Sequence, residues 1–99
     1  MSEEEIKSGY RVIQDVTEKV IERGKRIFSN PDAVRILSAK LMLGPDGWGG
    51  YAYYINVVYE MDGIQYRVTK QVVADINEVL MHLLDDIESF YERMHKIKL

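Results

Sequence analysis

Side chains able to hold a metal ion are few in this sequence. His82 and Asp86 stand four residues apart in a stretch with helical periodicity, so they would share one helix face, with Asp85 beside them. His95 has only Glu92 as a comparable neighbour. The chain has no cysteine and no His-Glu-x-x-His pattern to supply further ligands. We therefore expect these side chains to form an exposed polar face, with no metal site and no cofactor.

A nucleophilic catalytic site is equally hard to build. The chain has no thiol, and none of its serines lies in a Gly-x-Ser-x-Gly pattern. The glycine-rich segment 44–50 lacks the Gly-x-x-x-x-Gly-Lys-Ser/Thr pattern of a phosphate-binding loop, and it joins two expected strands rather than preceding a helix. We identify no catalytic residue, and the sequence favours a non-enzymatic protein.

Tyrosine is the residue type that stands out. Five tyrosines are expected on the side of the sheet that faces the helices, one from the first helix and four from the strands: Tyr10, Tyr51, Tyr53, Tyr59 and Tyr66. Buried phenol hydroxyls need hydrogen-bond partners. Small residues opposite them, Gly9, Thr17 and Gly24, could leave room for a small apolar ligand. Alternatively, the rings fill the core near strand ends and keep their hydroxyls in water.

The opposite face of the expected sheet has the composition of a protein interface. Its apolar centre and its rim consist of Lys40, Met42, Tyr54, Asn56, Val58 and Arg67. Aromatic residues, Met and Arg are enriched in interfaces between proteins. Both expected helices are needed on the other face, which leaves nothing to cover this one. The alternative is an ordinary solvated face with scattered apolar side chains.

Five elements must position these side chains. Helical spacing of apolar residues and strict alternation predict a helix, three strands and a second helix over 3–29, 34–43, 51–61, 64–69 and 71–97. Asp75 with Glu78 resembles an N-terminal cap of the second helix, but Val72 and Val73 also fall on its apolar stripe, so both starts stay open. The predicted fold class is α+β, a two-layer α-β-β-β-α arrangement with two long helices on one face of a three-stranded antiparallel meander. We expect residues 1–99 to form one domain. Such agreement among local signals is also typical of designed sequences, although the glycine-rich loop is irregular.

The register of the last two strands follows from one turn. Asp62-Gly63 between two alternating segments is a strong hairpin signal. A two-residue turn there pairs Tyr59 with Tyr66 and makes both faces of the hairpin internally consistent, which a slipped register would not.

Composition and charge restrict the partners. The 99 residues are 46% apolar and 29% charged, which is typical of a globular protein, and the net charge is −3. This charge gives no long-range attraction to phosphate backbones or anionic membranes. No stretch reads as a transmembrane helix, and the acidic residues 2–5 are unlike a signal peptide. Together with the absence of cysteine, these features favour a cytoplasmic protein without a membrane partner.

The expected element order resembles, in topology alone, that of the double-stranded-RNA-binding domain. That module meets phosphates with lysines at the start of its second helix. Here Lys70 stands alone and is followed by apolar and then acidic residues.

The leading hypothesis is a protein-interaction module, a homodimer or a small partner-binding regulator that uses the open sheet face. A small-molecule-binding domain with a tyrosine-lined pocket ranks second, and a nucleic-acid-binding domain ranks third.

Overall fold

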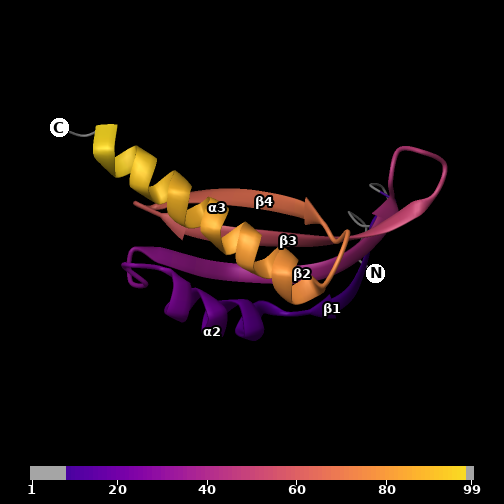
Figure 1. The fold of residues 1–99 in the computed structure, drawn as a ribbon, viewed down its shortest axis with the longest axis horizontal. Coiled ribbons are helices and arrows are strands. Elements are labelled where there is room, and N and C mark those ends of the chain that lie inside the picture. The colour runs from indigo at the N-terminus through magenta and orange to yellow at the C-terminus, as the bar shows by residue number, and fades with distance from the viewer. Residues whose placement is uncertain (1–8, 98–99) are drawn as a thin grey trace.

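The computed structural model describes residues 9–97 (Figure 1). In chain order its elements are β1 (Arg11–Asp15), α2 (Thr17–Ile27), β2 (Val34–Pro45), β3 (Tyr51–Met61), β4 (Ile64–Gln71) and α3 (Ile76–Ile97). The strands form an antiparallel sheet in the order β1-β2-β3-β4. The α+β class is therefore confirmed. The predicted three-stranded meander corresponds to β2, β3 and β4, and the sheet has a fourth strand, β1.

The prediction of one continuous helix over 3–29 is wrong within the described residues. Arg11–Asp15 pair with β2, where Arg11 lies opposite Leu43 and Asp15 opposite Lys40. Val12 and Ile13 are β-branched and suit a strand, and the pairing satisfies backbone groups of β2 that would otherwise lie at an edge. Residues 3–8 of the predicted helix lie outside the described part.

The side chain of Asp15, the last residue of β1, stabilises the start of helix α2. The backbone N–H and the hydroxyl of Thr17 both donate hydrogen bonds to Oδ1 of Asp15, the former at 2.9 Å. The helix ends at Ile27, and the backbone N–H of Phe28 still donates to the carbonyl of Gly24. The sequence therefore turns from strand to helix within two residues, which helical spacing alone does not indicate.

The predicted register of β3 and β4 is confirmed. Tyr59 lies opposite Tyr66, and Met61 opposite Ile64. Asp62 and Gly63 occupy the turn with φ of 55° and 77°. Two consecutive residues with positive φ are what a two-residue hairpin turn of type I′ requires.

The last helix begins later than the predicted residue 71. Val72 still belongs to the sheet region, since its backbone N–H donates to the carbonyl of Tyr53 at 2.8 Å. Helix α3 starts at Ile76, and the Asp75 side chain accepts a hydrogen bond from the N–H of Asn77 at 2.9 Å. The acidic residue just before the first turn, rather than the apolar periodicity, marks the start of the helix.

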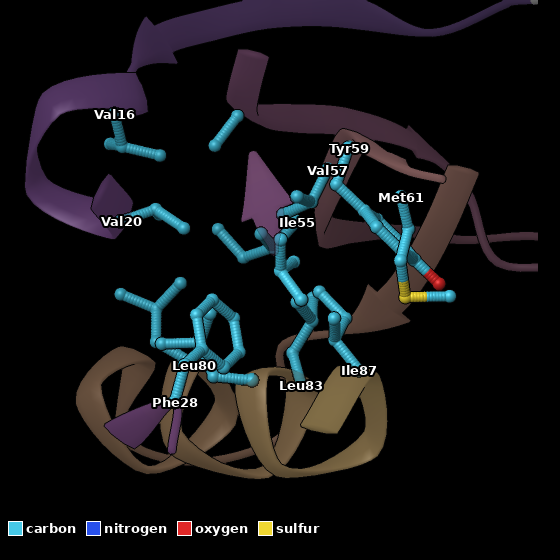
Figure 2. Packing of buried hydrophobic residues seen from close by; sticks show 13 residues of the cluster. Val16, Val20, Phe28, Ile55, Val57, Tyr59, Met61, Leu80, Leu83 and Ile87 are labelled. Atoms are coloured by element: carbon cyan, nitrogen blue, oxygen red, sulfur yellow. The ribbon is translucent and has the colours of Figure 1, made fainter. Parts of the chain in front are cut away.

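One hydrophobic core lies between the sheet and both helices. Figure 2 shows Val20 and Phe28 on one side of it, and Leu80 and Leu83 of α3 reaching toward Ile55 of β3. The buried positions of β3 are the odd-numbered ones from Ile55 to Met61. Both helices thus bury their apolar sides against the same sheet face. The connection between β2 and β3 projects beyond both helices (Figure 1).

Candidate functional site

The structure brings the six residues of the predicted interface onto one sheet face. In the register of the central strands, Met42 lies opposite Tyr54 and Lys40 opposite Asn56. Val58 in turn lies opposite Arg67 of β4. Directly paired residues of antiparallel strands project to the same side. We call this surface the open face, because both described helices pack on the other side of the sheet (Figure 1).

An aromatic pair forms the end of the open face nearest the β2–β3 loop. The rings of Tyr10 and Tyr54 lie edge to face with centroids 5.5 Å apart, and Tyr10 covers Gly44. The hydroxyl of Tyr54 donates a hydrogen bond to the carbonyl of Pro45 at 3.0 Å. Loss of water contact raises the pKa of Tyr54, and the neighbouring Tyr10 and Asp46 add to the effect. This end of the face is held in a defined geometry.

The centre of the open face is half-buried and weakly polar. Nδ2 of Asn56 contacts the sulfur of Met42 at 3.9 Å, and Thr69 donates to Oδ1 of Asn56 at 3.4 Å. Met42 and Val58 are each only partly exposed. The polar groups at the centre thus have some of their hydrogen-bond partners within the face. This lowers the free-energy cost of removing water from them when a partner binds.

Charges of both signs surround this centre. Asp15 lies opposite Lys40 in the register, and Arg35 lies opposite Glu60. Hydrogen bonds from Thr17 lower the pKa of Asp15, and the charge of Lys40 contributes in the same direction. With Arg67, these residues give the open face three bases and two acids, so its net charge is small and positive in a chain whose net charge is −3.

The tyrosines proposed to line a ligand pocket do not come together. Tyr59 and Tyr66 stack in the core with centroids 5.4 Å apart, and Tyr66 also meets Phe90 edge to face at 5.1 Å. Tyr59 is 5% exposed, so its ring fills the core. Burial is the main cause of its raised pKa, with a smaller contribution from Tyr66.

The other three tyrosines lie elsewhere, which corrects the expected arrangement. Tyr51 and Tyr53 do belong to the helix-facing side of β3, but they lie where the hairpin extends past the helices, and they are 76% and 49% exposed. Tyr10 precedes β1 and lies on the open face, because the chain there is not helical. These three tyrosines therefore do not line one pocket with Tyr59 and Tyr66.

Sequence reasoning missed the contribution of the N-terminal strand to the open face. Tyr10, Val12 and Asp15 extend the face beyond β2, because Val12 lies opposite Met42 and Asp15 opposite Lys40. The available signal was the pair Val12-Ile13, whose β-branched side chains favour a strand over a helix.

Comparisons of this chain with protein-family models, curated proteins and solved structures found no match. Among residues 9–97, no group of three or more metal-ligating side chains comes together. No helix in the same part of the chain is long and apolar enough to cross a membrane.

Proposed function

We propose that this chain is a non-enzymatic protein-interaction module that forms a homodimer through the open face. One observation carries the proposal: an aromatic and methionine centre, Met42, Tyr54 and Val58, lies half-buried on a sheet face that no described helix covers. Aromatic and Met side chains at the centre of a surface, with charges at its rim, are typical of protein interfaces.

The distribution of charge favours a second copy of the chain as the partner. A two-fold dimer places the same surface on both sides, so that surface must be complementary to itself. The open face carries acids and bases in neighbouring pairs, Asp15 with Lys40 and Glu60 with Arg35. A strongly basic or acidic face would repel its own copy.

Sedimentation of the wild type and of two face variants tests this proposal. We expect the wild type to sediment as a dimer at micromolar concentration. Tyr54→Glu and Val58→Glu should each sediment as folded monomers, because each places an unpaired charge at the centre of the buried patch. Val58→Glu is needed beside Tyr54→Glu because Tyr54 also contacts Tyr10 and Pro45 within its own chain. Loss of those contacts could change the fold as well as the interface.

A matched control uses an apolar residue away from the open face. Met81 lies on α3 and is 53% exposed, so Met81→Glu should remain dimeric. Circular dichroism checks that every variant is folded. A wild type that stays monomeric up to the highest soluble concentration refutes the homodimer, as does a folded Val58→Glu variant that remains dimeric.

A further inference from the structure

Trp48 is the sole tryptophan of the chain, and its side chain is 92% exposed. It lies in the loop between β2 and β3, which projects beyond the helices (Figure 1). Two exposed tyrosines, Tyr51 and Tyr53, follow it at the start of β3. Tryptophan is the residue type most often found as an energetic anchor of protein interfaces, where it fills a pocket in the partner. Among residues 9–97, the Trp48 ring is not part of the core cluster.

Hydrogen bonds within the loop hold the backbone of Trp48 in a defined position. The backbone N–H groups of Trp48 and Gly50 both donate to Oδ1 of Asp46, at 2.7 and 3.1 Å, and the N–H of Asp46 donates to the carbonyl of Gly50 at 3.1 Å. Gly47 and Gly49 flank the tryptophan with φ of 85° and 87°. Anchors ordered in advance lose little conformational freedom on binding.

A groove that suits an aromatic ring lies at the other end of the sheet. It measures about 510 Å³ and runs between α2 and the segment that enters β2. Ile21 and Ile36 provide its partly exposed apolar surface, and the buried residues Gly24, Phe28 and Val34 complete its apolar lining. The groove therefore provides apolar side chains against which the exposed Trp48 ring of another molecule can be buried.

The charges of loop and groove are complementary. The loop has one charged side chain, Asp46, whereas Lys25 and Arg35 line the groove together with Asp32. A cation beside the groove also favours a bound indole ring through its π-electron face. Loop and groove lie at opposite ends of β2, a strand of 12 residues that spans about 40 Å at 3.3 Å per residue. They cannot meet within one chain.

We infer that Trp48 of each copy docks in the groove of the other copy, an inference that rests on the proposed homodimer. In a two-fold dimer, the open faces of the two copies can stack with the strands of one copy antiparallel to those of the other. The row formed by Lys40 and Asn56 can then lie along the two-fold axis. Trp48 lies eight residues after Lys40, and Asp32 in the groove lies eight residues before Lys40. The two-fold axis therefore relates the Trp48 end of one copy to the groove end of the other. The tip of one hairpin then reaches the end of the partner's sheet, where Arg35, which lies opposite Glu60 on the open face, borders the groove.

The same antiparallel arrangement suits the open face. Tyr54 precedes Asn56 by two residues and Val58 follows it by two, so each Tyr54 ring lies over the partner's Val58. Asp46 of the loop approaches Arg35 of the other copy by the same symmetry. In a parallel arrangement the two Asp46 carboxylates would instead face one another, at a cost in repulsion.

Trp48 itself reports on the docking. Indole emission moves to shorter wavelength when the ring loses water contact, and no second tryptophan interferes. We expect the emission to shift over the concentration range in which sedimentation detects the dimer. Trp48→Ala should weaken the dimer by at least tenfold, while the monomeric Val58→Glu variant should emit at the longer wavelength at every concentration.

Engineered cysteines define the orientation, because the chain has none of its own. We expect a Trp48→Cys chain mixed with an Asp32→Cys chain to form a disulfide-linked heterodimer on mild oxidation. Trp48→Cys alone should not link to itself. Glu78→Cys is the matched control, since Glu78 is exposed and lies in the first turn of α3, at the loop end of the sheet. It should not link to Trp48→Cys.

The possible outcomes separate the inference from the proposed function. A dimer that Val58→Glu abolishes, but whose Trp48 emission never shifts and whose Trp48→Cys chains link to each other, overturns the docking and leaves the homodimer standing. A wild type that is monomeric at every concentration overturns both.

Discussion

The ring of Tyr10 lies edge to face against the ring of Tyr54, with the two planes at 80°. Gly44 of β2 lies beneath Tyr10, and a Cβ atom added to it would come within 1.9 Å of Cδ1 of the ring. This contact connects the chain before β1 to the hairpin of β2 and β3. It also means that one end of the open face depends on a glycine that is needed for close approach rather than for its dihedral angles.

Gly44→Ala should therefore destabilise the fold by overpacking, by about 1–3 kcal/mol. Urea denaturation measures the loss. The matched background is the Tyr10→Ala variant, in which the ring is absent and the methyl group introduced by Gly44→Ala has room. In that background, Gly44→Ala should change the free energy of unfolding by less than about 0.5 kcal/mol. Equal costs in both backgrounds would show that the ring is not what the methyl group meets.

The Asp62-Gly63 turn allows a test of its left-handed backbone geometry. Gly63 has a φ of 77°, and a Cβ added there meets no atom within 4 Å, so any cost of substitution comes from the backbone. Gly63→Ala should lower the free energy of unfolding by about 1–2 kcal/mol, the cost of left-handed geometry for a residue with a Cβ. Gly63→Asn should cost less, because Asn tolerates this region better. Equal loss in the two variants would argue against a backbone cause.

Gly24 in α2 tests the packing of the first helix. It is buried, and a Cβ added to it would lie 2.9 Å from Cε2 of Phe28, whose ring belongs to the core. Gly24→Leu should destabilise the protein by about 1–3 kcal/mol in denaturant unfolding, since the larger side chain must displace this ring. Glu22→Leu, at an exposed position of the same helix, is the control and should stay close to the wild type. A midpoint for Gly24→Leu equal to that of the wild type would contradict the close contact with Phe28.

Stability should decrease at high pH in part through Tyr59. Burial raises the pKa of Tyr59 above the ordinary value of 10.0, so the folded protein holds this proton more tightly than the unfolded chain does. The unfolded chain therefore binds fewer protons above pH 10, and the free energy of unfolding must fall as the pH rises from about 10 through the folded pKa. Tyr59→Phe should make this decline shallower.

Tyr51→Phe is the control for this pH dependence, because Tyr51 is 76% exposed. It should leave the slope of stability against pH as in the wild type. Thermal unfolding from pH 9 to pH 11 measures all three proteins. A Tyr59→Phe variant with the slope of the wild type would show that the phenol of Tyr59 titrates alike in the folded and unfolded states.

Local chemistry in the sequence was enough to determine the hairpin of β3 and β4 and the part of the open face that β2, β3 and β4 provide. Asp62-Gly63 selects a two-residue turn, and the alternation on either side then places every partner, including Tyr59 opposite Tyr66. The pairing of β2 with β3 also placed Lys40, Met42 and Tyr54 together, because strand periodicity assigns each side chain to a face. In these segments the local signal and the final contacts agree.

Only the tertiary structure decided that Arg11–Asp15 form a strand, that Tyr10 lies on the open face, and that Tyr51 and Tyr53 are exposed. The spacing of apolar residues before α2 is compatible with a helix as well as with a short strand. The free edge of β2 decides between them, because its backbone groups need partners that lie 25 to 32 residues away in the sequence. How far the helices cover the hairpin likewise depends on where the helices end in space, which no local pattern in the sequence records.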